Sequence, residues 1–393
     1  MRKKKLLILN SFYSPTIIGG AEISTQLLAE SLTNYYKVYV LTTGKQRRKI
    51  KIDHINGVTV YRIPCLNIYW PGNKKDRNII AKLIWHSFNV YNPIQKRLLE
   101  NIIKSIKPDI IHSQNLMGIG TYIWQIANRY SIPVIHTLRD YTLFQPVSNK
   151  YVNKIIEVIN KKRSEKVQAV VGISNYILNQ HLNKGFFENS FSTSIHNVVK
   201  SQKYPKRIRS EGEPLIIGYF GQLEKNKGVE LLLRVVSELD SSVVKKVIIC
   251  GTGKEESSLK DWIKKDSRII FKGKIPHEQV QKLMAQIDLT VVPSIWEEPF
   301  GRVIIESYAQ GTPVIASNVG GIPEVIYKKS YLFSPNKLEE LKDKIINFYY
   351  LRSEDLQKEI KSLINYSYRF TDNVLQYIEV YEAALRNKID SSL

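Results

Sequence analysis

The chain has 393 residues, of which 43% are hydrophobic. This length supports two or three domains that each bury a core, and the composition excludes a disordered, collagenous or disulfide-rich protein. Only two cysteines occur, Cys65 and Cys250, so a disulfide framework and a thiolate metal site are excluded, and we expect both thiols in the core. The seven histidines show no paired metal-ligand spacing, so no bound metal is expected.

Positive charge is concentrated in the first half of the chain. Residues 1–200 contain 29 Lys plus Arg against 10 acids, a net charge of +19, whereas residues 201–393 contain 29 against 26, a net charge of +3. A half with this net positive charge suits binding to an anionic partner, which is a membrane surface, a phosphorylated acceptor or nucleic acid. The alternative is a solvated surface without a partner. Four basic runs are expected to form one broad face: Arg2 to Lys5, Lys45 to Lys51, Lys74 to Arg77 and Lys161 to Lys166.

The apolar runs are all short. Residues 6–9, LLIL, follow the basic start and are too few for a signal peptide, and no run elsewhere approaches the roughly eighteen residues of a membrane span. We therefore expect a cytoplasmic protein that is held peripherally at the inner face of the cell membrane by its basic half.

The first half alternates short apolar strands with helical stretches. Strands rich in Val and Ile that alternate with helices predict a parallel sheet covered on both faces, as in a Rossmann-like domain. After them, residues 197–214 are polar, with two prolines and one glycine, and predict an interdomain linker. The predicted strands are 6–10, 37–43, 58–63, 109–114, 133–138 and 169–174.

A second alternating series follows, so the sequence predicts two doubly wound α/β units in tandem. Helical periodicity then continues over residues 336–365 and 371–388 without another strand. In open α/β sheets ligands bind beyond the carboxyl ends of the strands, so we expect the two units to face a cleft that holds the site. The strands of the second series are 215–221, 246–253, 269–273, 289–294, 313–317 and 331–333.

Glu298 and Glu306 stand around a predicted helix N-terminus. The strand 289–294 is followed by Pro299 and Gly301, which break the chain, and residues 302–310 have helical spacing. Two carboxylates with backbone N–H groups and the positive end of the helix dipole between them suit a polyhydroxylated ligand that carries phosphate, such as a nucleotide sugar. The alternative is two solvated surface charges.

The surrounding run, with 310-QGTPVIAS-317 and the glycine-rich 320-GGIPE-324, resembles the donor-binding signature of retaining glycosyltransferase family 4, which has the GT-B fold. The resemblance spans nearly the whole chain. It implies transfer from a UDP- or GDP-linked sugar to a hydroxyl of a glycan or lipid-linked acceptor in cell-surface polysaccharide synthesis, with retention and without metal or other cofactor. It also implies domains at 1–200 for the acceptor and 201–370 for the donor, with a helix at 371–393 that returns to the first domain.

The resemblance assigns roles to several residues. Glu306 would bind the ribose, Glu298 the transferred sugar, and Lys227, near a helix start, the diphosphate. Gly19 and Gly20 precede the first helix, where glycines let ligand oxygens approach backbone N–H groups, and with Glu22 they resemble the GG-x-E loop of the family. Further donor contacts are expected at Gln222, Gly251, Gly253, Lys274, Ile275, Pro299, Phe300, Gly301, Arg302 and Val303.

Two positions depart from the commonest family pattern. Gln222 stands where many members have arginine, and Arg139 stands where many have histidine. We therefore expect Arg139 to contact a ligand oxygen, oriented by Asp140, with a structural ion pair as the alternative, and we expect His136 to be a strand residue. Glu298, Arg139 and Asp140 are the candidate catalytic residues, and a direct role of Glu298 at the sugar stays open.

Two other function classes fit parts of this pattern. A sugar-nucleotide epimerase or hydrolase on the same fold would use the donor without an acceptor. A nucleic-acid-binding protein would explain the charge, but the sequence has no helix-turn-helix, zinc or ribonucleoprotein signature.

Overall fold

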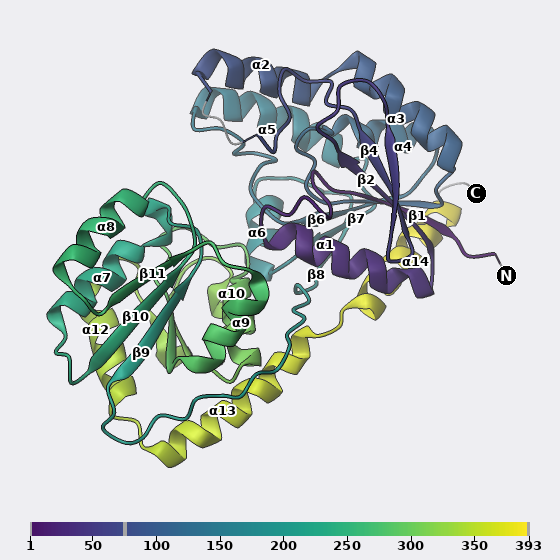
Figure 1. Ribbon diagram of the computed structural model, residues 1–393. Helices are drawn as coiled ribbons and strands as arrows, with labels where there is room; N and C mark the ends of the chain where they lie inside the picture. Colours follow the sequence, from purple (N-terminus) through teal and green to yellow (C-terminus); the bar gives the residue numbers. More distant parts are fainter. Residues whose placement is uncertain (1, 74–76, 391–393) are drawn as a thin grey trace. The chain divides into compact units, whose positions relative to one another are not determined.

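The computed structural model describes residues 2–73 and 77–390, which form two compact units. Unit 1 comprises Met1–Val198 and Asn373–Leu393, and unit 2 comprises Val199–Asp372, so the end of the chain belongs to the same unit as its start (Figure 1). In the described parts, none of the helices is both long and apolar enough to span a bilayer. Residues 74–76 of the third basic run lie outside the described residues.

Unit 1 is built on an eight-stranded sheet in the order β3-β4-β2-β1-β5-β6-β7-β8. All neighbouring strands are parallel except β3, which pairs with β4 in the antiparallel sense. The strands β3 and β8 were not predicted from the sequence, because these edge strands are largely exposed and lack a continuous apolar run. The strands are β1 (Lys5–Leu9), β2 (Lys37–Thr43), β3 (Lys51–Ile55), β4 (Val58–Ile63), β5 (Ile110–Ser113), β6 (Val134–Leu138), β7 (Ala169–Gly172) and β8 (Phe191–Ser194).

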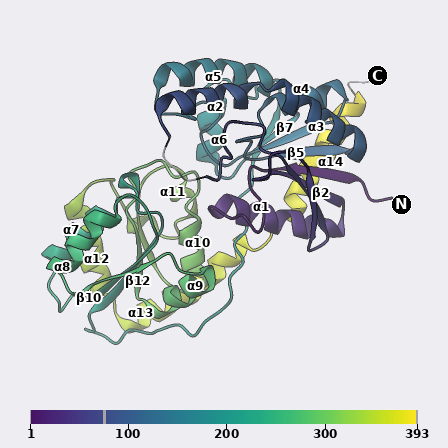
Figure 2. The same ribbon diagram turned by 45° about the horizontal axis from the view of Figure 1, so that its top comes forward.

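Helices cover both faces of this sheet (Figures 1 and 2). On one face, Leu6 and Ile8 of β1 pack in a buried cluster with Leu28 of α1 and Tyr377 and Tyr381 of α14. The helices of unit 1 are α1 (Gly20–Ser31), α2 (Ile79–Val90), α3 (Pro93–Ile106), α4 (Tyr122–Arg129), α5 (Lys150–Ser164), α6 (Asn175–Leu182) and α14 (Val374–Asp390), with a 3₁₀ turn η1 (Leu32–Asn34).

The helix α14 is tied to the sheet by polar contacts as well as by packing. His112 of β5 is fully buried, and its Nδ1 lies 2.7 Å from the Tyr381 hydroxyl while its Nε2 lies 2.8 Å from Thr137 Oγ1. Thr137 Oγ1 in turn lies 3.3 Å from the Tyr377 hydroxyl. The last helix is therefore part of the core of unit 1. The two ring nitrogens of His112 and the hydroxyls of Tyr377 and Tyr381 all have hydrogen-bond partners there, as buried polar groups need.

Unit 2 contains an all-parallel six-stranded sheet in the order β11-β10-β9-β12-β13-β14. Alternation along β9 sends Ile217 and Tyr219 into a cluster with α7 (Val229–Glu238) and α12 (Leu338–Tyr349), and Phe220 into a smaller cluster with Met284 of α9 (His277–Gln286). Both cysteines are buried and reduced. The strands are β9 (Leu215–Phe220), β10 (Val244–Cys250), β11 (Ile269–Gly273), β12 (Leu289–Val292), β13 (Val314–Ser317) and β14 (Leu332–Phe333).

The helical run predicted over 336–365 is two helices, α12 and α13, separated at Tyr350 to Arg352. The helices of unit 2 are α7 (Val229–Glu238), α8 (Glu256–Lys265), α9 (His277–Gln286), α10 (Arg302–Ala309), α11 (Ile322–Val325), α12 (Leu338–Tyr349) and α13 (Ser353–Ser367). The 3₁₀ turns of this unit are η2 (Lys225–Lys227), η3 (Lys329–Tyr331) and η4 (Tyr368–Phe370).

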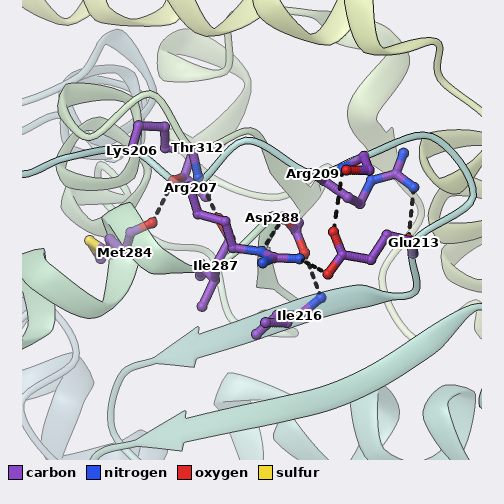
Figure 3. A network of polar contacts seen from close by, with 10 residues as sticks. Lys206, Arg207, Arg209, Glu213, Ile216, Met284, Ile287, Asp288 and Thr312 are labelled. Carbon is purple, nitrogen blue, oxygen red and sulfur yellow. Dashed lines mark hydrogen bonds and ion pairs between the residues drawn. The ribbon is translucent and has the colours of Figure 1, made fainter.

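The polar segment predicted as a linker is packed on unit 2 over most of its length. Figure 3 shows Arg207 between Asp288 and Glu213, with a 2.5 Å bond from Nη2 to Glu213 Oε1 and a 3.2 Å bond from Nε to Asp288 Oδ1. Lys206 donates to the Ile287 carbonyl, and Arg209 Nη1 donates to the Glu213 carbonyl at 2.9 Å. The chain passes from unit 1 to unit 2 within the predicted linker, between Val198 and Val199, and residues 199–214 contain no helix or strand. The fixed partners of this segment on unit 2 were not expected, because composition does not distinguish a solvated polar segment from one whose charges are paired.

The prediction of one broad basic face was wrong. The run Arg2 to Lys5 leads into β1, whereas the run Lys45 to Lys51 follows the end of β2. Because β1 and β2 are parallel neighbours, the first run lies at the N-terminal ends of the strands and the second at their C-terminal ends, about 16 Å apart along the strands.

Candidate functional site

At the carboxyl edge of the unit 2 sheet, the loops after five strands are hydrogen-bonded to one another. The sheet order places these strand ends side by side, so the loops form one continuous surface. The backbone bonds run from Gly251 N to Gly273 O (2.9 Å), from Leu223 N to Thr252 O (3.0 Å), from Ile295 N to Asn226 O (2.9 Å) and from Gly321 N to Glu298 O (2.7 Å).

Two glycines permit the close approach of these loops. Gly228 has φ of 68°, and a Cβ on it would lie 2.0 Å from the Pro293 carbonyl oxygen. Gly320 has φ of 58°, and its Cβ would lie 2.3 Å from the Glu298 carbonyl oxygen. A side chain at either position would clash and would also be strained in the left-handed region. These glycines therefore fix the backbone on both sides of the Glu298 loop.

This packing brings Lys227 against Glu298. The Lys227 ammonium donates to Glu298 Oε1, and the same oxygen accepts a 3.0 Å bond from the Ser294 hydroxyl. The ammonium also lies 4.9 Å from the ring centroid of Trp296. The carboxylate and its counter-ion are both partly buried, so their interaction is less screened than at an open surface.

Glu306 lies in α10 and is held by two nitrogen groups. Its Oε1 accepts from Arg302 Nε at 2.7 Å and lies 3.0 Å from His277 Nε2. Burial alone would raise the pKa of this carboxyl, but the contacts with His277 and Arg302 outweigh burial and lower it below the ordinary value. Glu306 is therefore ionised at neutral pH. The N-cap of α10 is Gly301, with φ of 88° and no side chain to cover the helix N-terminus.

The other predicted donor residues divide into exposed and packed groups. Gln222 and Lys274 are exposed beside the loops, whereas Pro299 is buried. The Phe300 side chain is buried, and its ring centroid lies 6.2 Å from that of Phe370, so it contributes to the core. Ile275 and Val303 pack against the cluster of Phe220 and Met284, and a Cβ on Gly253 would lie 2.1 Å from the Leu223 carbonyl oxygen.

At the carboxyl edge of unit 1, Arg139 is buried and held by side chains that follow two other strands of the sheet. Its Nε donates to Gln114 Oε1 and its Nη1 donates to Asn197 Oδ1, each at 2.6 Å. Gln114 Oε1 also accepts from Thr25 Oγ1 of α1 at 2.5 Å. Gln114 follows β5, Arg139 follows β6 and Asn197 follows β8, so the guanidinium is fixed by segments distant in sequence.

Asp140, which was expected to orient Arg139, is held by other residues. Asn115 Nδ2 donates to its Oδ2 at 2.9 Å, and the Thr142 amide and hydroxyl donate to its Oδ1 at 2.9 and 2.5 Å. Burial raises the pKa of this carboxyl above its ordinary value, against the hydrogen bonds from Thr142 and the charge of Arg139. Asp140 is thus a well-positioned hydrogen-bond acceptor in its own right.

The backbone amide of Gly19, just before α1, is bound within its own helix start. The Gly19 amide donates to Glu22 Oε2 at 2.7 Å, and the Ile18 amide donates to the same oxygen at 3.3 Å. Glu22 therefore caps its own helix and occupies the Gly19 N–H group that was expected to meet a ligand oxygen.

A pocket in unit 1 lies between α2, α5 and the loops that carry Gln114 and Asp140. The Gln114 side chain is 2% exposed, and its Nε2 is a buried donor without a hydrogen-bond partner among the described residues. His136, a β6 residue as expected, has its pKa lowered to about 3 by burial, so it is neutral. The polar side chains of the lining include His86, Asn89, Gln114, Asn115, Thr121, His136, Arg139, Asp140, Thr142 and Asn160.

Several residues at the carboxyl edges of the two sheets were not predicted from the sequence. Ser294, Trp296 and His277 contact Lys227, Glu298 or Glu306, and Gln114 and Asn197 hold Arg139. A serine at a strand end is a weak signal for Ser294. The others have no signal, because their roles depend on which loops meet.

Comparisons with known proteins agree with this architecture. Residues 200–369 match Glycosyl transferases group 1 and residues 18–203 match Glycosyltransferase Family 4. An uncharacterised 42.6 kDa protein in the cps region of Klebsiella pneumoniae is 36% identical over 332 residues, covering 81% of this chain and 87% of that protein.

Solved structures share the fold at low sequence identity. The sucrose-phosphate synthase of Thermosynechococcus elongatus superposes with a TM-score of 0.73 at 18% identity, covering 97% of this chain and 98% of that one. Anabaena HepE in complex with UDP superposes with a TM-score of 0.66 at 19% identity, covering 99% and 100%. The chain therefore belongs to glycosyltransferase family 4 and is a glycosyltransferase with the GT-B fold.

Proposed function

We propose that this glycosyltransferase moves a sugar from a UDP- or GDP-linked donor to a hydroxyl of a glycan or lipid-linked acceptor, with retention and without a metal or other cofactor. The observation that carries the proposal is the contact between Lys227 and Glu298 at the loop edge of unit 2. In a sugar nucleotide the sugar hydroxyls adjoin the phosphates, so a carboxylate beside an ammonium matches both groups.

The donor is assigned to unit 2. Glu298 accepts hydrogen bonds from hydroxyls of the transferred sugar, and Lys227 and Arg302 offset the charge that develops on the leaving diphosphate. Among the described contacts, Glu306 Oε1 takes both nitrogen partners and Oε2 takes none, which supports a bond from a ribose hydroxyl to Oε2. The UDP in the structure of the Anabaena protein makes uridine nucleotides the first donors to test.

The acceptor is assigned to the pocket of unit 1. Arg139 and Asp140 offer a cation and an acceptor there, and the unpartnered Gln114 Nε2 offers a donor. A sugar hydroxyl both donates and accepts, so this set suits a glycan better than an apolar compound. The relative in a cps region supports a role in surface polysaccharide synthesis, and the basic half supports work at the inner face of the cell membrane.

A donor screen tests the proposal. The protein is incubated with UDP- and GDP-linked sugars and candidate acceptors, and product mass identifies the transferred sugar. The anomeric coupling constant of the product reports retention or inversion, and activity in excess chelator reports metal dependence. Transfer by Glu298→Ala at the wild-type rate would remove the assignment of Glu298.

A sugar-nucleotide epimerase or hydrolase is the competing enzyme class. Incubation of donor alone separates it, because isomerised or free sugar would then form at the rate seen with acceptor. An electrophoretic shift assay with duplex and single-stranded DNA tests binding of nucleic acid, and we expect no shift at physiological salt.

A further inference from the structure

Large hydrophobic side chains are exposed on two helices of unit 1. Of the 22 that are exposed in the described part of the chain, eight lie on α2 and α5, which are 12 and 15 residues long. Exposed groups of this kind gain from a partner that removes them from water. They are Ile79 (64% exposed), Ile80 (64%), Leu83 (37%), Ile84 (43%) and Phe88 (40%) on α2, and Tyr151 (71%), Ile155 (64%) and Val158 (58%) on α5.

The two helices lie side by side in both views (Figures 1 and 2). Arg163 of α5 donates a 2.8 Å bond to the Val90 carbonyl at the end of α2, and Trp85 and Ile156 line the same pocket. The spacing of Ile80, Ile84 and Phe88, at every fourth residue, makes one stripe on α2. On α5, Tyr151, Ile155 and Val158 follow one another at spacings of four and three residues, which also places them on one face of the helix. The two exposed stripes therefore run along neighbouring helices.

The charges on these helices have one dominant sign. The α2 sequence contains Lys82 and no acidic residue, whereas α5 contains four lysines and one arginine against the single acid Glu157. Glu157 lies 3.8 Å from Lys154 in an ion pair, so its charge is partly neutralised. Lys150 and Lys154 stand among the apolar residues of the α5 stripe and are exposed.

We propose that the outward faces of α2 and α5, called here the α2–α5 face, dock onto an anionic lipid bilayer. Apolar side chains enter the interface between headgroups and acyl chains, and the lysines meet the phosphates. Nucleic acid would match the lysines and leave the isoleucines in water. A second copy of the chain would bring two sets of lysines together, so charge complementarity favours lipid.

This inference deepens the proposed function, because it rests on an acceptor at the membrane and names the surface that reaches it. The pocket assigned to the acceptor is lined by residues of both helices, Trp85 and Ile156 among them. Docking through the α2–α5 face would therefore hold that pocket next to a lipid-linked substrate.

Vesicle flotation tests the apolar part of the face. The full chain is floated with vesicles of phosphatidylcholine containing one third phosphatidylglycerol, and with pure phosphatidylcholine. We expect binding to the anionic vesicles, at least tenfold weaker binding by Ile80→Ser/Ile84→Ser, and unchanged binding by the control Ile52→Ser, whose side chain is 54% exposed on β3. Equal binding by all three proteins would overturn the proposal.

A charge pair tests the electrostatic part. Lys150→Gln/Lys154→Gln should weaken binding to anionic vesicles severalfold, whereas Lys260→Gln/Lys264→Gln, with the same spacing on α8 of unit 2, should not. An equal effect of both pairs would overturn the assignment to this face. If size-exclusion chromatography instead shows a dimer that Ile80→Ser/Ile84→Ser dissociates, the face is a contact between copies and the proposal falls.

Donor binding separates this inference from the proposed function. Titration with UDP and GDP in the absence of vesicles reports unit 2 alone, and the variants of α2 and α5 should bind donor as the wild type does. Normal donor binding without vesicle binding would defeat the docking face and leave the proposed function standing. Vesicle binding that depends on Ile80 and Ile84, without any nucleotide binding, would support the docking face and overturn the proposed function.

Discussion

Lys227 and Glu298 are 71 positions apart in the chain, and their side chains form an ion pair at the loop edge of unit 2. The pair depends on the 3₁₀ turn after β9 meeting the loop after β12, through bonds from the Ile295 and Trp296 amides to the Asn226 carbonyl. The group assigned to the diphosphate and the group assigned to the sugar are therefore in direct contact, and each positions the other.

Lys227→Ala should weaken binding of UDP- or GDP-linked donor by about tenfold, or about 1.4 kcal/mol, because it removes the ammonium beside the diphosphate. The loss should be larger at 20 mM than at 500 mM salt, since screening reduces the wild-type advantage. Isothermal titration measures it. Lys225→Ala changes an exposed lysine of the same turn and should bind donor normally; a matching loss there would make the effect one of general charge.

Gly320→Ala should damage the sugar subsite by displacing the Glu298 backbone. Its Cβ would lie 2.3 Å from the Glu298 carbonyl oxygen, whereas a Cβ on Gly212, with φ of 73°, would meet nothing within 4 Å. Both substitutions carry left-handed strain of about 1 to 2 kcal/mol. Only Gly320→Ala also meets the Glu298 backbone, so only this variant should raise the KM for donor. Urea unfolding and donor kinetics measure the two effects. Equal kinetic defects in both variants would refute a specific role for Gly320.

Glu306→Gln should destabilise unit 2 in a pH-dependent way. The folded-state pKa of Glu306 is lowered, so its ionised form contributes stability above the ordinary value of 4.5, and this is lost as pH falls through the folded-state pKa. The difference in unfolding free energy between wild type and variant should be about 1 to 3 kcal/mol at pH 7 and should shrink below pH 4.5. Urea titrations across this range measure it; a difference that grows toward acid would contradict the assignment.

Arg139→Lys should impair use of the acceptor with little effect on the donor. Lysine keeps the charge but loses the planar fork that reaches Gln114 and Asn197 together. We expect at least a tenfold fall in kcat/KM for acceptor with unchanged affinity for the nucleotide, measured by steady-state kinetics and titration. Arg129→Lys, an exposed position on α4, provides the control. A loss of nucleotide affinity in Arg139→Lys would move this residue to the donor side.

Lys206 should give a second pH signature, this one at alkaline pH. Burial lowers its pKa from 10.5 to about 8, although the charge of Asp288 acts against this. The unfolded chain therefore holds the proton more tightly, so the stability contributed by Lys206 rises with pH between about 8 and 10.5. The unfolding free energy of Lys206→Met, relative to wild type, should fall over this window. A flat difference would show that the ammonium of Lys206 is well solvated.

Much of the fold could be predicted from the strand and helix patterns of the sequence. The strands β2 and β4 have the bounds expected from their apolar runs, and α10 begins at Arg302 after the break at Gly301, as its spacing predicted. These features follow from local preferences, which sequence displays directly. The exposed strands β3 and β8 were missed because backbone pairing at a sheet edge leaves little trace in side-chain pattern.

By itself, the sequence determined two α/β series, two carboxylates around one helix N-terminus, and a family signature. Tertiary structure decided which groups meet: Lys227 with Glu298, His277 with Glu306, and Gln114 with Arg139. It also turned the expected linker into a segment packed on unit 2 and divided the basic runs between opposite sheet edges. The physical reason is that a side chain's partner depends on strand order and loop contacts over tens of residues, which periodicity and composition do not encode.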